Sequence, residues 1–277
     1  MTVVVFGASG QIGHFLLPRL RARGEPVIAV SRRPHAGGDR DGVQWFEGSL
    51  PDRVPALPPA AAIISFGPLL PFARWLAAAA PPNAPRIVAT SSMSAQSKAA
   101  SQVPAEREIA RQLKQGETEL AAACATLGCG WTVLRPTLIY GAARDKSLTP
   151  LAHRAMRARL FPLPAGRGLR QPVHADDIAL AALAAIDHPA DRVLMLGGGE
   201  RLRSAEMFAR VRRSLPVATL PVPLPAWLLR MVRHAVPRLR GPLTRLEADL
   251  VADNGEVERL LGVHPRPFRP DAGCWRS

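Results

Sequence analysis

The chain has 277 residues, of which 47% are hydrophobic and 21% charged, and its formal net charge is +14. This length suits one large α/β domain, or a nucleotide-binding domain with a smaller lobe. The balanced composition, with no low-complexity tract and no internal repeat, excludes a disordered or fibrous protein. No apolar run reaches the roughly 18 residues of a membrane span and no signal peptide is visible, so we expect a cytoplasmic protein.

The three cysteines argue against a disulfide framework or a zinc site. Cys124, Cys129 and Cys274 are an odd number and form no CxxC pair. Metal sites and disulfide scaffolds are recognised by paired spacings, which are missing here. We therefore predict no metal site.

The positive charge is concentrated toward the C-terminus. Residues 201–245 contain ten arginines and one acidic residue, Glu206. Within them the segment 224–241 spaces apolar residues such as Trp227 and Met231 as an amphipathic helix does. We favour a helix that packs its apolar face onto the core, and peripheral contact with a membrane surface is the less favoured alternative. No nucleic-acid partner is expected, because the chain lacks clustered aromatics for base stacking.

Apolar strand-like runs alternate with helical stretches through the first half, a pattern typical of parallel α/β layering. Strands are expected at residues 3–6, 27–30, 43–46, 61–65, 86–90 and 131–135, with helices following residue 11 and near 69–80 and 105–127. After residue 141 we expect strands at 171–173 and 192–196 among helices near 147–159, 176–187, 204–214 and 242–261.

The predicted fold is therefore α/β, a Rossmann doubly wound parallel sheet with a smaller, mostly helical C-terminal substrate lobe. The Rossmann dinucleotide-binding domain is assigned to residues 1–141, and the segment 171–197 is expected to return to it. Residues 142–170 and 198–277 are assigned to the substrate lobe.

A glycine-rich loop follows the first strand and opens the first helix. A dinucleotide pyrophosphate needs backbone N–H groups at a helix N-terminus, and glycines let it approach them. The loop therefore predicts cofactor binding by Gly7, Ser9, Gly10, Gln11, Ile12 and Gly13.

The residues after the second strand bear on which dinucleotide binds. Proteins that prefer NAD carry an acid there for the ribose 2′-hydroxyl, whereas this chain has Ser31, Arg32 and Arg33. Arginine favours a 2′-phosphate, so we predict NADP(H) in preference to NAD(H). The alternative is that one or both arginines are simply solvated.

Several segments together resemble the short-chain dehydrogenase/reductase superfamily, in its extended or atypical epimerase/dehydratase-like branch. The similar segments span the chain: GASGQIG (7–13), EGSL (47–50), ATSSMSA (89–95), WTVLRPTLIYG (131–141), QPVHADDIA (171–179) and LLGVHPRPF (260–268). The resemblance implies a strand order of 3-2-1-4-5-6 and a substrate lobe assembled from C-terminal segments. It also implies that Pro136 and Thr137 contact the cofactor, and it places Ser49 where the family has an aspartate that contacts the adenine.

The chemistry implied by the resemblance uses a serine, a tyrosine and a lysine, with the tyrosine exchanging a proton with the substrate oxygen. Ser92 matches the serine. The tyrosine and lysine positions fall on Ile109 and Leu113, so the usual YxxxK pair is missing. Lys114 lies one residue away, which turns a helical side chain by about 100°.

The candidate catalytic residues are therefore Ser92, Tyr140, His174 and Lys114. Tyr140 is the chain's one tyrosine and follows the sixth strand, where open α/β sheets build their sites. His174 can shuttle a proton near neutral pH. Each has a structural alternative: a turn serine, a buried tyrosine, a core histidine or a solvated lysine. Asp176 and Asp177 are interpreted as N-caps of a helix.

Two functions remain open from the sequence. The favoured one is an NADP(H)-dependent oxidoreductase or epimerase that acts on a small carbonyl or hydroxyl substrate without the usual YxxxK pair. The alternative is a dinucleotide-binding regulator or assembly subunit that has lost the chemistry.

Overall fold

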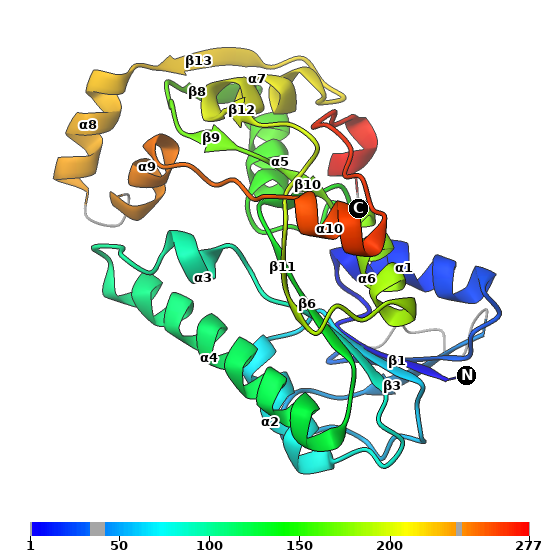
Figure 1. Cartoon of the computed structure of the whole chain (residues 1–277). Coiled ribbons are helices and arrows are strands. Elements are labelled where there is room, and N and C mark those ends of the chain that lie inside the picture. Colours follow the sequence, from blue (N-terminus) through cyan, green and yellow to red (C-terminus); the bar gives the residue numbers. More distant parts are fainter. Residues whose placement is uncertain (1, 34–41, 237–239, 277) are drawn as a thin grey trace.

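In the computed structural model, residues 2–33, 42–236 and 240–276 are described. Among them a parallel sheet forms the centre of the Rossmann part, with the order β11-β6-β5-β4-β1-β2-β3 (Figure 1). Its strands are β1 (Val3–Phe6), β2 (Val27–Ser31), β3 (Val43–Glu47), β4 (Ala62–Ser65), β5 (Arg86–Thr90), β6 (Trp131–Pro136) and β11 (Arg192–Leu196). The predicted order 3-2-1-4-5-6 is confirmed, and β11 extends it beyond β6.

The central strands are buried along their whole length, as expected for a parallel sheet covered on both faces. Helices α1 (Gln11–Ala22), α6 (Ala175–Asp187) and α10 (Gly255–Leu261) contribute to the apolar cluster on one face. Helices α2 (Leu69–Ala79) and α4 (Pro104–Leu127) contribute to the cluster on the other. This double covering matches the predicted doubly wound class.

Helix α4 has clear sequence signals at both ends. Pro104 occupies its first turn, where the missing N–H costs nothing. Gly128 ends it in the left-handed conformation with φ of +68°. The expected limits of 105–127 differ from those observed by one residue.

The smaller lobe combines helices with short two-stranded sheets (Figure 1). Its helices are α5 (Leu148–Ala158), α7 (Ser204–Arg213), α8 (Ala226–Ala235) and α9 (Arg240–Glu247), and the 3₁₀ turn η2 is Ala272–Trp275. Strand β8 (Leu160–Pro164) pairs with β13 (Leu220–Leu224), β9 (Leu169–Arg170) with β12 (Leu202–Arg203), and β7 (Ile139–Tyr140) with β10 (Val173–His174). The short helix α3 (Ser94–Ser97) follows β5.

Two predicted elements are corrected. The single helix expected over 242–261 is wrong, because residues between α9 and α10 run beside β9, where Leu250 N donates to Leu169 O at 2.8 Å. The strand expected over 171–173 is displaced, because Gln171 lies between β9 and β10. Its side chain binds backbone instead, accepting from Ala252 N and donating to Gly198 O, both at 2.8 Å.

Candidate functional site

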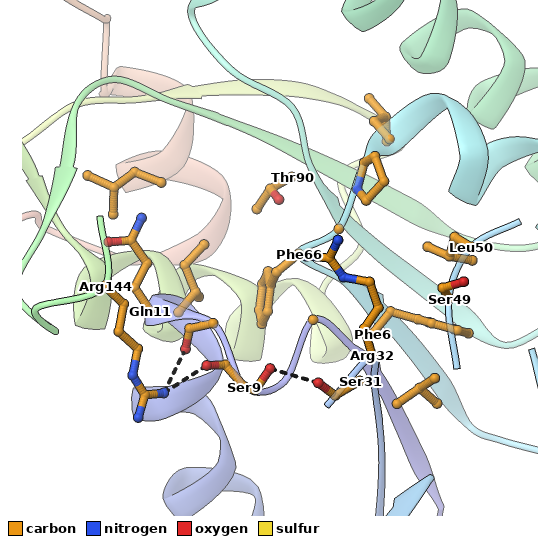
Figure 2. A pocket seen from close by; sticks show the side chains of 18 of the residues that line it. Phe6, Ser9, Gln11, Ser31, Arg32, Ser49, Leu50, Phe66, Thr90 and Arg144 are labelled. Atoms are coloured by element: carbon orange, nitrogen blue, oxygen red, sulfur yellow. Dashed lines mark hydrogen bonds between the residues drawn. The ribbon is translucent and has the colours of Figure 1, made fainter. Parts of the chain in front are cut away.

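A pocket of about 720 Å³ lies at the carboxyl ends of the sheet strands, within the size range of small-molecule sites (Figure 2). Ligands of open α/β sheets bind at this edge, next to the point where the strand order reverses. Here the reversal lies between β1 and β4. The pocket is lined by Phe6, Gly7, Ser9, Gly10, Gln11, Ile12, Val30, Ser31, Arg32, Gly48, Ser49, Leu50, Phe66, Gly67, Pro68, Leu69, Thr90, Ser91, Leu113, Ile139, Arg144, Asp145 and Lys146.

The glycine loop, residues 7–13, lines one side of the pocket, and the local backbone geometry favours glycine at Gly7, Gly10 and Gly13. Gly7 has φ of +72°, which glycine adopts most easily, and Gly10 donates its N–H to Gly7 O at 2.9 Å. A Cβ on Gly13 would lie 2.0 Å from Ala8 O, so this glycine allows α1 to pack closely on the loop. Gly10 makes no side-chain cap, and Gln11 is the first residue of α1. The helix N-terminus is thus presented to the pocket, as an anion site requires.

Gln11 leaves an unpaired acceptor in this pocket. Its Oε1 atom is buried and has no hydrogen-bond partner among the described residues. A buried polar atom without a partner is costly and calls for an explanation. A dinucleotide that fills the pocket would supply donors there, so the residues present fit such a cofactor.

Two arginines lie on either side of the loop in Figure 2. Arg144 donates from Nη1 to the carbonyl oxygens of Ser9 at 2.8 Å and Gly10 at 3.4 Å. Arg32 lines the opposite side. Between them the hydroxyls of Ser9 and Ser31 share a hydrogen bond of 2.9 Å. This rim carries two guanidinium groups, and among the described residues directly after β2 none that lines the pocket is a carboxylate.

Arg33 does not line the pocket. Its side chain is exposed, and its backbone closes a turn with Ser31 Oγ, which donates to Arg33 O at 3.1 Å. Of the two arginines predicted to read a 2′-phosphate, Arg32 is therefore the one that the structure brings to the pocket.

The wall formed by β5, β7 and α4 carries both apolar and hydroxyl side chains and, among its described residues, no charged one that lines the pocket. Leu113 and Ile139 line it, together with the hydroxyls of Thr90 and Ser91. Ser91 donates to Glu117 Oε1 at 2.5 Å, and Arg135 binds the same carboxylate through Nε at 3.0 Å. The Ser91 hydroxyl is thus held by a buried ion pair.

None of the four predicted catalytic residues is among the residues that line this pocket. Lys114 is exposed on α4, one position beyond Leu113, which does line it. Ser92 is half-buried in the turn before α3, where its Oγ accepts from Ser94 N at 3.1 Å. The structure therefore does not bring Ser92, Tyr140, His174 and Lys114 together around one cavity.

Tyr140 occupies a core position. It is only 1% exposed, and its ring packs against His174 and Phe268 with centroid separations of 5.0 and 4.8 Å. Burial raises the pKa of its phenol above the ordinary value of 10.0. A tyrosine that exchanges protons near neutral pH needs the opposite shift.

His174 is the N-cap of α6 and accepts from Asp176 N through Nδ1 at 3.1 Å. Burial, followed by the nearby Arg266 guanidinium, lowers the pKa of its imidazole. Gly141 has φ of +115°, and a Cβ there would lie 2.3 Å from His174 Nε2. The lack of a side chain at Gly141, which ends the segment 131–141, therefore leaves room for the imidazole of His174.

The interpretation of the two acids after His174 as N-caps is wrong. His174 already caps α6, and Asp176 and Asp177 lie inside its first turn. Both are bound by Arg266, through Nη2 to Asp176 at 2.8 Å and through Nε to Asp177 at 2.7 Å. They join α6 to the C-terminal segment.

Pro136 and Thr137 are buried beside the pocket but do not line it. Pro136 pairs with Leu196 across β6 and β11, and Thr137 donates its hydroxyl to Gln171 O. The neighbouring Ile139 takes the lining position.

Three pocket residues from one loop were not expected from the sequence. Arg144, Asp145 and Lys146 precede α5 and carry no motif that marks them. Asp145 serves the helix, since its carboxylate accepts from the N–H groups of Ser147 at 2.8 Å and Leu148 at 2.6 Å. The sequence signal that was available is the Asp–x–x–Leu start of an apolar helical pattern, which predicts a cap but no ligand contact.

The described parts of the chain contain no group of three or more histidine, cysteine, aspartate or glutamate side chains that could hold a metal ion. Over the same residues no helix combines the length and apolarity needed to cross a bilayer.

Other proteins resemble this chain in part of its sequence or in its fold. Residues 76–197 match the NAD dependent epimerase/dehydratase family. No curated protein sequence matches the chain. The fold is shared by MoeE5 in complex with UDP-glucuronic acid and NAD, with a TM-score of 0.74 at 20% identity over 99% of this chain and 97% of that one.

Two epimerases of solved structure are similar in the same way. The UDP-glucose 4-epimerase of Thermotoga maritima has a TM-score of 0.72 at 17% identity, over 96% of this chain and 94% of its own. The UDP-glucuronic acid 4-epimerase of Bacillus cereus, in complex with NAD, has 0.72 at 13%, over 99% and 96%. Residues 76–197 therefore match the NAD dependent epimerase/dehydratase family, and the chain as a whole shares the fold of these solved structures.

Proposed function

We propose that this chain binds NADP(H) in the glycine-loop pocket and acts as an oxidoreductase or epimerase on a small carbonyl or hydroxyl substrate. The observation that carries the proposal is the pocket itself. It presents the N-terminus of α1, the three-glycine loop and a buried, unpartnered Gln11 Oε1 to one space of about 720 Å³. A dinucleotide satisfies these groups together, because its pyrophosphate accepts from the backbone N–H groups and its hydroxyl and amide groups supply donors for Gln11 Oε1.

The preference for NADP(H) rests on the pocket rim. Arg32 lines the pocket directly after Ser31, where NAD-preferring proteins place a carboxylate. Guanidinium groups bind phosphate with paired hydrogen bonds, and no acid at this position opposes a 2′-phosphate. The two solved structures described above as NAD complexes share the fold at 20% and 13% identity. At such identities their NAD does not decide which dinucleotide this chain binds.

The bound dinucleotide supplies hydride transfer, and the chain must supply binding, orientation and the proton. Ile109 and Leu113 cannot exchange a proton. Among the described residues lining the pocket, the ionisable side chains are Arg32, Arg144, Asp145 and Lys146. Asp145 holds the start of α5, and a guanidinium does not deprotonate in proteins, so Lys146 is the candidate proton donor.

Titrating the purified protein with NADPH and NADH, followed by tryptophan fluorescence, tests the binding step. Arg32→Glu should weaken NADPH by roughly tenfold or more while sparing NADH, since it replaces a charge-assisted contact to phosphate by repulsion. Arg144→Ala is the matched control, because loss of a cation beside the loop should weaken both cofactors alike. Equal effects of Arg32→Glu on the two cofactors would contradict the 2′-phosphate assignment.

Turnover is tested by offering the NADPH complex a panel of carbonyl compounds and nucleotide sugars and following absorbance and product composition. Lys146→Met should reduce kcat by a larger factor than it weakens NADPH binding, because the proton donor is lost together with one of the cations that line the pocket. Unaltered kcat in this variant would remove Lys146 from the mechanism.

A second function is favoured by one observation, the apolar pair at Ile109 and Leu113. A chain that binds the dinucleotide without converting it, as a regulator or assembly subunit, needs no proton donor at these positions. It predicts tight cofactor binding and no turnover with any member of the panel.

A further inference from the structure

Helix α8 exposes part of the apolar surface that the sequence predicted to pack onto the core. Trp227 is 59% exposed and Met231 is 63% exposed. They lie four residues apart and therefore on the same side of the helix. Leu228, Leu229 and Val232 are half-buried on the other side. The expected packing holds for that inner side and is wrong for Trp227 and Met231.

The strand that leads into α8 also exposes apolar side chains. Leu220 is 68% exposed and Val222 is 36% exposed, and they share one side of β13. Leu220 pairs with Leu160 of β8, which is 48% exposed. Figure 1 shows β13 and α8 at the end of the molecule away from the main sheet. Trp227 and Met231, one turn apart on α8, thus form an exposed apolar face, which is a feature of interaction sites.

The charge around these residues is positive. Arg230 is exposed between Trp227 and Met231, and Arg157 and Arg159 are exposed directly before Leu160. Within the described ranges, no acidic side chain forms an ion pair with any of these three arginines. The segment 224–241 contains basic residues and no acid, although 237–239 lie outside the described residues.

An exposed tryptophan and methionine flanked by arginines combine the two features of a helix that lies in a membrane interface. The apolar side chains enter the boundary between headgroups and acyl chains, while the arginines meet anionic headgroups. A protein partner would need a complementary acidic surface around an apolar pocket, whereas an anionic lipid surface offers both features without a specific shape. We propose that α8 with β13, referred to below as the α8 surface, docks the protein on an anionic lipid surface.

Co-sedimentation of the full chain with vesicles tests this proposal. We expect binding to vesicles of phosphatidylcholine with 30% phosphatidylglycerol, weakened by added salt, and much weaker binding to phosphatidylcholine alone. The emission of Trp227 should shift to shorter wavelength on binding, and Trp227→Phe should remove that shift. No binding to either vesicle would overturn the proposal.

Variants separate the α8 surface from the overall charge of the chain. Trp227→Ser combined with Met231→Ser should weaken binding by roughly tenfold or more, because apolar insertion is lost. Arg230→Glu should weaken it by roughly tenfold through charge. Arg276→Glu, which changes an exposed arginine beside η2, is the matched control and should have little effect.

Two further measurements keep the result specific. Thermal unfolding should be unchanged in the serine double variant, since both side chains are exposed. Sedimentation velocity should give the same oligomeric state for the wild type and this variant. If the double variant instead loses self-association and retains vesicle binding, the α8 surface is an interface between copies and the proposal is wrong.

Discussion

The lack of a side chain at Gly13 allows α1 to pack closely against the glycine loop. The Cβ of any other residue at Gly13 would lie 2.0 Å from Ala8 O and 2.6 Å from Ala8 C. These atoms belong to the backbone, which yields less easily than a flexible side chain, so Gly13→Ala must displace α1 from the loop. We expect a loss of about 1–3 kcal/mol in the free energy of unfolding, as for other overpacked sites, together with weakened cofactor binding.

Urea unfolding and NADPH titration of Gly13→Ala check this expectation. Gly255→Ala is the control, because its nearest neighbour is the flexible carboxylate of Asp253 at 3.3 Å. Wild-type affinity in Gly13→Ala would mean that the loop tolerates the displacement.

The buried pair of Glu117 and Arg135 makes a second prediction at the scale of residues. Their side chains are 9% and 12% exposed, and Arg135 Nη2 lies 2.5 Å from Glu117 Oε2. Glu117→Ala leaves a buried guanidinium without its partner and should cost about 3–5 kcal/mol. The double variant Glu117→Leu/Arg135→Met, which removes both charges, should recover a substantial part of that loss.

A double-mutant cycle in urea measures this coupling. If the destabilisation of the double variant equals the sum of the effects of Glu117→Leu and Arg135→Met, the pair contributes no specific interaction. Because Ser91 also donates to Glu117, the pocket volume near Thr90 should change only in variants that remove the carboxylate.

Helix α6 gives a prediction at the scale of an element. His174 caps it in the neutral form, accepting from Asp176 N, and burial and the Arg266 guanidinium lower its pKa below 6.5, while Asp177, Asp176 and Asp271 oppose this effect. The unfolded chain therefore takes up a proton at higher pH than the folded one. The free energy of unfolding contributed by this histidine is fully present above about pH 6.5 and is lost as the pH falls below it.

Urea unfolding between pH 8 and pH 5 tests this dependence. His174→Asn keeps a cap acceptor but removes the titration, so its stability should fall less steeply with decreasing pH than that of the wild type. Parallel pH profiles for the two proteins would show that His174 does not carry the effect.

Elements with strong local signals were predicted well from the sequence. Strands β1, β2 and β5 are short, apolar, β-branched runs, and α4 has proline and glycine at its ends. The region from α9 to α10 was not, because its helical periodicity gives no sign that residues 248–254 run beside β9. That course depends on hydrogen bonds to Leu169 and Gln171, some 80 residues away in sequence.

At the scale of the whole molecule, the candidate site also contains some residues that the sequence predicted and others that it did not. The glycine loop and Arg32 follow local rules of strand, turn and helix, and the sequence located them. Arg144 and Lys146 reach the pocket only because the loop before α5 passes over the N-terminus of α1. A position of this kind is fixed by tertiary packing, which spacing in the sequence does not encode.

Arg144 also links the two parts of the molecule, since it joins the loop before α5 to the carbonyl oxygens of Ser9 and Gly10. A dinucleotide bound there contacts both parts and should stabilise them together. At a cofactor concentration 100 times Kd the gain is about 2.7 kcal/mol, which for a chain of this size raises Tm by about 5 °C. Thermal unfolding with and without NADPH measures the gain, and hydrogen exchange should show added protection both in the glycine loop and at the start of α5. In Arg144→Ala we expect a smaller Tm shift at the same NADPH concentration and protection confined to the loop. Protection confined to the loop in the wild type would mean that the cofactor does not bridge the two parts.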